Sequence, residues 1–276
     1  MIKTPRLSII MGTYNRASFL GAAIKSIQKQ TFTDWELIIA SDGSIDNTSQ
    51  AVEEWKKKEG RIVFINNQAN QGISKNYNTA FAIAQGEYIA MIDDDDPWSD
   101  PEKLEKQIKF LDEHQEYVGC GGGVIVIDGE GREKYRYLKP ETDKAIRSKM
   151  LFGNPMANST TVFRRDAAER VGWYDGSIRY SGDRDFWLKM GRIGKLYNFP
   201  QYFSYYTMTG HNTSIDKIKP HLKTSLMVMR RYKSDYPGYP LALVLNWLQY
   251  VYAFLPKGLR KLIHASLARL KRLVVG

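Results

Sequence analysis

The chain has 276 residues, 43% of them hydrophobic and 25% charged, with a formal net charge of +10 at pH 7. This length can bury one substantial α/β core with an appended segment, and the absence of a fixed-period repeat excludes a repeat architecture. Cys120 is the single cysteine, which excludes an internal disulfide and favours a reducing, cytosolic compartment. Its apolar, glycine-rich surroundings predict a small core residue.

The first half of the chain alternates apolar strands with helices. A strand at 7–11 leads through the polar turn 12–16 into a helix whose apolar face carries Phe19, Leu20, Ala23, Ile24 and Ile27. A strand at 35–40 leads through the polar turn 41–48, whose residues can cap the next helix. Strands at 61–65 and 88–92 flank a helix at 74–84. This alternation predicts a parallel, doubly wound sheet. The first apolar run is too short for a signal peptide, so a cytoplasmic protein is expected.

Four consecutive aspartates, Asp93 to Asp96, follow the last of these strands. Clustered carboxylates repel one another, and a bound divalent cation is the commonest compensation. A solvated acidic turn before Pro97 is the alternative for an acidic run taken alone. Ligands of doubly wound sheets bind at the carboxyl ends of the strands, where residues 13–16, Asp42 and the aspartates would converge. The pattern therefore favours one metal-containing site.

Four segments together resemble glycosyltransferase family 2, which comprises inverting GT-A enzymes that use nucleotide-sugar donors. The matching segments are SIIMGTYNR at 8–16, SDGSIDNTS at 41–49, NQGISKNYNTAFAIAQGEYIAMIDDDD at 70–96 and VGWYDGSIRYSGDRDFWLKM at 171–190. Their order and spacing fit the family over about the first 210 residues. The resemblance implies a GT-A, Rossmann-like, mostly parallel sheet with helices on both faces, and it says little about the sugar.

The resemblance also implies roles for individual residues. Asp93 and Asp95 match the two acids of the family's Asp-X-Asp motif, so they are the expected ligands of Mn or Mg, with Asp93 near the ribose. The expected nucleotide-sugar contacts are Thr13, Tyr14, Asn15, Arg16, Asp42, Lys75, Asp93 and Asp94. A solvated lysine on a helix is the alternative for Lys75.

Asp183 aligns with the family's catalytic base, and Gly182 stands where the family usually has a glutamate. A carboxylate opposite the leaving group can take the proton of an attacking acceptor hydroxyl. A single displacement of this kind inverts the anomeric configuration. The alternative is that Asp183 is an acid at a helix N-terminus, where the helix dipole stabilises negative charge. Phe186, Trp187 and Met190 have helical spacing and are expected in the core.

One family element is altered. Many relatives carry an arginine and a histidine after a strand that ends near residues 205–206, whereas here Thr209 occupies the histidine position and His211 follows two residues later. His211 is therefore a candidate metal or diphosphate ligand from a loop, and an unliganded loop histidine is the alternative.

The positive charge is concentrated in the last sixty residues. Twelve Lys and Arg and one acid, Asp235, give residues 217–276 a charge of +11, and the rest of the chain carries −1. The apolar run 241–255 is too short to span a bilayer, and leucines alternate with basic residues in 259–273. This pattern predicts helices on an anionic membrane surface. A helical cap on the catalytic domain, a dimer interface or nucleic-acid binding are the alternatives; nucleic acid is disfavoured because no recognised binding motif is present.

These observations predict a catalytic domain at 1–215, with a nucleotide-sugar half at 1–98 and an acceptor half at 99–215, followed by a basic helical tail at 216–276. The expected function is transfer of one sugar, with a UDP-sugar as the favoured donor, to a lipid-linked carbohydrate on the cytoplasmic membrane face during polysaccharide assembly. A non-catalytic glycan- or sugar-nucleotide-binding relative and a sugar-phosphate nucleotidyltransferase are the alternatives. The first strand lacks the glycine-rich, arginine-bearing loop that a nucleotidyltransferase would need. The oligomeric state is open.

Overall fold

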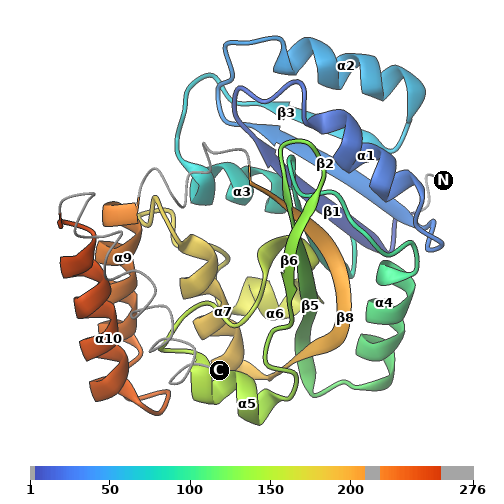
Figure 1. The fold of residues 1–276 in the computed structure, drawn as a ribbon. Coiled ribbons are helices and arrows are strands. Elements are labelled where there is room, and N and C mark those ends of the chain that lie inside the picture. Colours follow the sequence, from blue (N-terminus) through green and yellow to red (C-terminus); the bar gives the residue numbers. More distant parts are fainter. Residues whose placement is uncertain (1–3, 209–217, 256–276) are drawn as a thin grey trace.

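The structure is a computed structural model that describes residues 4–208 and 218–255. An eight-stranded mixed sheet lies between layers of helices, with a helical pair at one side of the molecule (Figure 1). The strand order is β3-β2-β1-β4-β7-β5-β6, and β8 pairs with β5. This architecture confirms the predicted α/β class with helices on both faces of the sheet.

The first half of the chain builds the parallel half of the sheet. Its strands are β1 (Leu7–Thr13), β2 (Trp35–Ser41), β3 (Ile62–Asn66) and β4 (Tyr88–Asp93), and its helices are α1 (Leu20–Gln28), α2 (Thr48–Lys58) and α3 (Ile73–Phe81). All pairings among these strands are parallel, as predicted. Each predicted strand and helix is present within a few residues of its expected limits.

Both faces of this sheet are buried, which explains why its strands are almost continuously apolar. Successive side chains of a strand point to opposite faces. Ile9 and Met11 accordingly pack into one core cluster, with α1, α2 and α4 (Lys103–Glu113), whereas Ile10 packs into the other, with α3 and α7 (Gly182–Ile193). Cys120 is fully buried, as expected.

The second half of the chain adds the mixed part of the sheet. Its remaining elements are β5 (Tyr117–Asp128), β6 (Glu133–Tyr137), α5 (Asp143–Lys149), the 3-10 turn η1 (Asn158–Thr160), β7 (Val162–Arg164), α6 (Arg165–Arg170) and β8 (Lys195–Met208). The strand β7 is antiparallel to both β4 and β5, whereas β8 runs parallel to β5. This arrangement places η1 and the end of β8 beside the carboxyl end of β4.

The C-terminal helices α9 (Ile218–Arg231) and α10 (Tyr239–Tyr252) lie together beside α7 (Figure 1). Val228, Met229 and Tyr232 of this region belong to the same core cluster as Phe186 and Trp187 of α7. The helical cap on the catalytic domain, one of the alternatives for the tail, is therefore observed for α9, because the buried face of α9 completes the core. The leucine-rich segment 259–273 lies outside the described residues.

Candidate active site

A cavity of about 610 Å³ opens at the carboxyl ends of the parallel strands. The register of the sheet brings its walls together, because Gly12 lies opposite Asp93 and Thr13 lies opposite Ser41. The cavity is lined by seven of the predicted site residues from the first half of the chain, together with the candidate base: Thr13, Tyr14, Arg16, Asp42, Asp93, Asp94, Asp95 and Asp183. The convergence expected from the doubly wound topology is therefore present.

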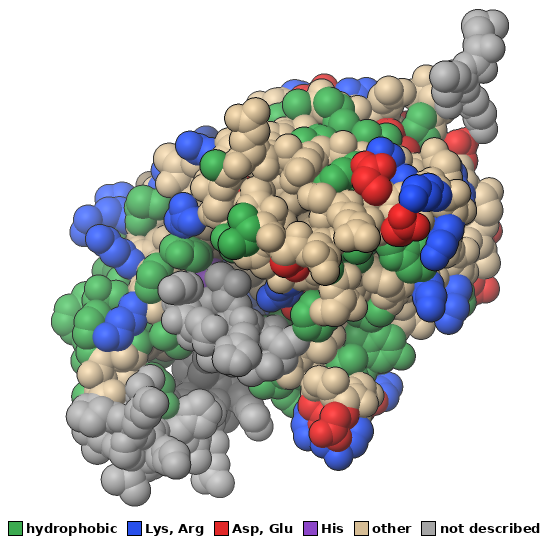
Figure 2. Space-filling view, turned by 90° about the horizontal axis from the view of Figure 1, so that it is seen from above, with side chains coloured by type: hydrophobic (Ala, Val, Ile, Leu, Met, Phe, Trp, Pro, Cys, Tyr) green, Lys and Arg blue, Asp and Glu red, His purple; other side chains and the backbone are tan. Residues whose placement is uncertain are grey.

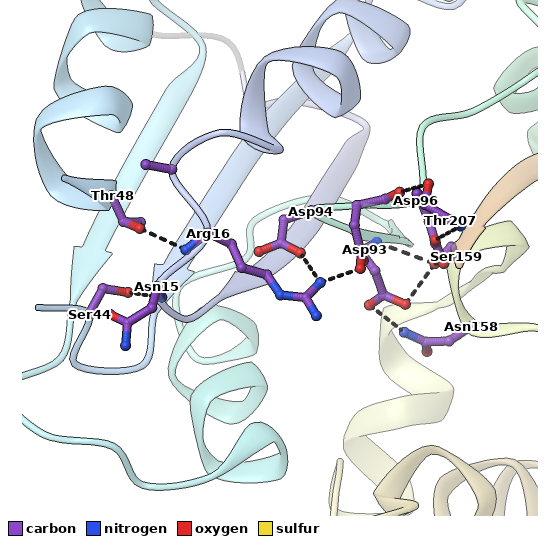
Figure 3. Close-up of polar contacts among 12 residues, drawn as sticks. Asn15, Arg16, Ser44, Thr48, Asp93, Asp94, Asp96, Asn158, Ser159 and Thr207 are labelled. Atoms are coloured by element: carbon purple, nitrogen blue, oxygen red, sulfur yellow. Dashed lines mark hydrogen bonds and ion pairs between the residues drawn. The ribbon is translucent and has the colours of Figure 1, made fainter. Parts of the chain in front are cut away.

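Asp93 is held by three side chains from two other elements, and Figure 3 shows the two from η1, Asn158 and Ser159. Its carboxylate accepts hydrogen bonds from the Tyr77 hydroxyl at 2.6 Å, from Ser159 Oγ at 2.7 Å and from Asn158 Nδ2 at 3.3 Å. Gly12 makes room for this arrangement, since a Cβ there would lie 2.9 Å from the Tyr77 ring. Asp93 is thus fixed in orientation before any ligand arrives.

Asp94 and Asp95 share one counter-charge, the Arg16 guanidinium (Figure 3). Its Nη1 lies 3.2 Å from Asp94 Oδ1 and also pairs with Asp95 Oδ2. Burial, followed by repulsion from Asp95, raises the pKa of Asp94 to about 7, and burial also raises the pKa of Asp95. One arginine therefore incompletely neutralises the acidic cluster.

Asp96 points away from this arginine and joins β4 to β8 (Figure 3). Its carboxyl group accepts the backbone N–H of Thr207 at 3.1 Å, and its Oδ2 lies 3.2 Å from Ser159 Oγ. Burial and the neighbouring carboxylates raise its pKa well above the usual value. These contacts give Asp96 a structural role at the carboxyl end of β4.

The remaining residues of the first half differ in their exposure to the cavity. Both carboxylate oxygens of Asp42 accept backbone N–H groups, from Gln71 at 2.7 Å and Gly72 at 3.0 Å, so Asp42 also fixes the loop before α3. Asn15 has a left-handed backbone and accepts the Ile45 N–H at 2.8 Å; it shapes the loop and does not line the cavity. Lys75 is exposed and lines a smaller neighbouring pocket of about 250 Å³.

Asp183 lies in the first turn of α7 and lines the same cavity as Asp93, Asp94 and Asp95. Asn154 Nδ2 donates to its Oδ2 at 2.7 Å. Burial raises the pKa of Asp183, while the hydrogen bonds from the Arg184 backbone and Asn154 oppose that rise. The arrangement suits a proton acceptor that is oriented by a neutral amide.

Packing explains why position 182 holds a glycine and not the glutamate that is usual in the family. A Cβ at this position would lie 2.2 Å from Ser74 Oγ, whose hydroxyl donates to the Ile178 carbonyl at 2.6 Å. A glutamate therefore cannot be accommodated at position 182 while Ser74 stays in place. The expected core residues Phe186, Trp187 and Met190 are fully buried and do not form a sugar platform.

The tertiary structure adds cavity residues that the sequence did not single out. They are Tyr77, Lys139, Arg179, Tyr180, Ser181 and His221. Asn154, Asn158 and Ser159, in a loop expected to face the acceptor, also line the cavity. No local pattern distinguishes these residues from ordinary helix and loop residues.

The proposed metal ligand His211 lies outside the described residues. Within 4–208 and 218–255, no group of three or more His, Cys, Asp or Glu side chains is arranged to hold a metal ion. Asp93 and Asp95 nevertheless provide the hard oxygen donors that Mg²⁺ and Mn²⁺ prefer.

The sequence profile described as Glycosyl transferase family 2 matches residues 8–172. The chain belongs to glycosyltransferase family 2. It is 34% identical over 193 residues to the putative glycosyltransferase EpsE of Bacillus subtilis (strain 168), covering 69% of this chain and 68% of EpsE. It is 27% identical over 225 residues to the putative teichuronic acid biosynthesis glycosyltransferase TuaG of the same organism, covering 80% of this chain and 86% of TuaG.

Solved structures of low sequence identity share the fold of this family 2 member. S. aureus TarS 1-349 in complex with UDP-GlcNAc superposes with a TM-score of 0.67 at 19% identity, covering 90% of this chain and 73% of TarS 1-349. The mannosyltransferase PcManGT from Pyrobaculum calidifontis, in complex with GDP-Man and Mn²⁺, gives a TM-score of 0.66 at 17% identity, covering 99% of this chain and 84% of that chain. Both likenesses confirm the GT-A fold.

The apolar run 241–255 of this glycosyltransferase raises the question of a membrane-spanning helix. Among the described residues, no helix combines the length and the hydropathy needed to cross a membrane.

Proposed function

We propose that this protein is a metal-dependent, inverting glycosyltransferase that moves one sugar from a nucleotide-sugar, with a UDP-sugar favoured, to a carbohydrate acceptor. One observation carries the proposal: Asp183 faces the same cavity as Asp93 to Asp95, so a base and a diphosphate-binding edge are available to one bound donor. Single displacement needs this pair and no carboxylate nucleophile.

The donor half of the cavity is assigned to Thr13, Tyr14, Asp42 and the first aspartates, with Asn15 shaping its loop. TarS binds UDP and UDP-GlcNAc, and PcManGT binds GDP-Man, which supports a nucleotide-sugar of either nucleotide class. The positive side chains Arg16 and Arg179 in the cavity wall are suited to the diphosphate. Lys75 is a weaker candidate because it lies outside this cavity.

The acidic cluster fits a divalent cation, either Mn²⁺ or Mg²⁺. Asp93 and Asp95 would hold it, and oxygens of the donor diphosphate would complete its ligands, since the protein carboxylates do not form a closed site by themselves. When bound, the cation supplies charge compensation for the diphosphate leaving group. Burial raises the pKa values of Asp94 and Asp95, and the neighbouring aspartates raise them further, so a bound cation would favour the ionised form of both carboxylates.

Other residues orient the carboxylates of the site, and Asp183 carries out the proton transfer. Tyr77 and Ser159 keep Asp93 in a single orientation. Asp183 takes the proton of the acceptor hydroxyl, and Asn154 orients its carboxylate. Because attack and departure occur on opposite faces of the sugar, an α-linked donor gives a β-linked product.

The acceptor is proposed to be a growing, lipid-linked glycan at an anionic membrane surface. The apolar surface of α10 supports this location, because six large apolar side chains on this helix and directly after it are 39–58% exposed: Leu241, Val244, Trp247, Leu248, Val251 and Phe254. Hydrophobic and basic side chains occur together on this side of the molecule (Figure 2). The similarity to TuaG supports a polysaccharide pathway.

A thermal-shift screen of the purified protein tests the donor site. UDP-GlcNAc, GDP-mannose and a dTDP-sugar are compared with and without Mn²⁺, because a ligand of the native state raises the apparent melting temperature. We expect a shift for one nucleotide class that requires metal and disappears in Asp95→Ala. The absence of a shift with every donor would favour a non-catalytic relative.

A further inference from the structure

The turn that precedes the candidate base is strained. Ser181, the residue before α7, has φ 58° and ψ 33°, a left-handed conformation that costs a non-glycine residue roughly 1–2 kcal/mol. A serine at this position usually accepts an N–H of the helix, but the Ser181 side chain makes no such bond. Something other than helix capping must therefore hold the turn.

His221 of α9 contacts this turn directly. Its Nδ1 lies 2.7 Å from Ser181 Oγ, and its ring lies 5.1 Å from the Tyr180 ring, between centroids, at an interplanar angle of 50°. His221, Tyr180, Ser181 and Asp183 all line the same cavity. A residue forty positions away along the chain thus touches both residues that lead into Gly182 and Asp183.

The helix α9 is fixed in place by polar contacts with α7. Arg231 Nη1 lies 2.8 Å from Asp185 Oδ1, and the Tyr232 hydroxyl donates to the same oxygen at 3.0 Å. Arg184 also donates to Ser225 Oγ. These contacts fix α9 relative to α7, so His221 lies at a fixed position beside the turn.

We propose that His221 is a positioning residue for Asp183: its hydrogen bond to Ser181 and its contact with Tyr180 hold the left-handed turn that presents the Asp183 carboxylate to the cavity. The importance of this position for turnover rests on the proposed role of Asp183 as the base. The C-terminal helical segment then contributes to the active site, in addition to any contact with a membrane.

The electrostatics of the site agree with this role. Burial raises the pKa of Asp183, and nearby Asp93 raises it further, whereas Asn154, the Arg184 backbone and His221 oppose the rise. His221 therefore lies close enough to favour the ionised carboxylate, which is the form that accepts a proton.

Hydrogen exchange in the first turn of α7 tests the inference without any substrate. In His221→Ala the backbone amides of 184–186, which begin with the Arg184 N–H donated to the Ser181 carbonyl, should exchange about three- to tenfold faster, as expected for the loss of one hydrogen bond of about 1 kcal/mol. His221→Asn keeps a polar atom at the position of Nδ1 and should restore protection, whereas His221→Gln should not. His114→Ala is the matched control, because His114 also packs on an aromatic ring, that of Phe110, and lies outside the cavity.

A second variant separates holding of the turn from general packing. Glycine adopts a left-handed backbone without the cost paid by serine. Adding Ser181→Gly to His221→Ala should therefore recover protection at 184–186. Unchanged exchange in His221→Ala, faster exchange throughout the protein, or no recovery with Ser181→Gly would each overturn the proposal. The outcome is independent of turnover, so a failure of Asp183 as the base would be recognised separately.

Discussion

Asp183 has a raised pKa and accepts a hydrogen bond from the Asn154 amide. At the scale of the residue, the isosteric change of Asp183 to asparagine tests its role as the base. Asp183→Asn keeps the shape of the side chain but cannot accept the acceptor proton. Turnover should fall by about 10²- to 10⁴-fold, the usual contribution of a general base. Donor affinity, measured by thermal shift, should stay within twofold because the aspartates of β4 are unchanged. Retained turnover would remove Asp183 from the mechanism.

Gly182 offers a second residue-scale prediction. Gly182→Ala should lower the melting temperature, because overpacking against Ser74 Oγ costs roughly 1–3 kcal/mol. Adding Ser74→Ala leaves only the Ser74 Cβ, at 3.4 Å from the new methyl group, and should recover part of the loss. Thermal denaturation of the two single variants and the double variant checks this coupling. Strictly additive effects would show that Ser74 does not explain the glycine.

At the scale of elements, α4 begins with a lysine that is fully buried. Lys103 Nζ has no hydrogen-bond partner among the described residues and lies 4.1 Å from the centre of the Trp98 ring. Burial lowers the pKa of Lys103 to about 7. Its protonated form is therefore disfavoured in the folded protein compared with the unfolded chain.

This burial predicts a pH-dependent stabilisation by Lys103→Met. Well below pH 7 the lysine is protonated in both states and its full cost is present. Between about pH 7 and the unfolded pKa of 10.5, the unfolded chain binds more protons than the folded protein, so the cost shrinks as the pH rises. Lys103→Met should thus raise the melting temperature by several degrees at pH 6 and by less at pH 9. Lys106→Met, which removes a partly exposed ion pair with Asp100, is the control and should not stabilise.

At the scale of the whole molecule, α9 and α10 determine how far the catalytic domain extends. Asp185 is fully buried, and its partners Arg231 and Tyr232 both come from the segment after residue 215. A chain ending at 215 should lose cooperative thermal unfolding, because it exposes the core and leaves a buried carboxylate without these partners. A chain ending at 255 should unfold cooperatively in circular dichroism. A stable 1–215 fragment would instead support the predicted boundary at 215.

The proposed membrane association also belongs to the scale of the whole molecule. Val244→Ser combined with Trp247→Ser should abolish co-sedimentation with phosphatidylglycerol vesicles, since both side chains are more than half exposed on α10. Tyr135→Ser, at a similarly exposed position on β6, is the control. Binding by the double variant equal to that of the unchanged protein would assign the surface to another partner. Added salt should weaken binding, because twelve Lys and Arg lie in residues 217–276.

Local patterns were sufficient for the first half of the fold and for the principal carboxylates. The strand and helix periods of residues 7–92 depend on neighbours along the chain, and parallel strands bring their carboxyl ends to one edge. Asp42, Asp93 and Asp95 could therefore be assigned to one cavity in advance. The antiparallel pairing of β7 with β4 and β5 could not, because it joins segments separated by dozens of residues and leaves no local period.

The sequence by itself determined the family, the α/β class and the chemical groups of the candidate site, because motifs and periodicity are local properties. Only the tertiary structure decided how these groups are held: Tyr77 and Ser159 on Asp93, Asn154 on Asp183, and His221 on the turn before α7. Each of these contacts depends on the packing of elements distant in the chain. Burial has the same origin, and it sets the raised pKa of Asp183 and the lowered pKa of Lys103, since the surrounding protein that excludes water exists only after folding.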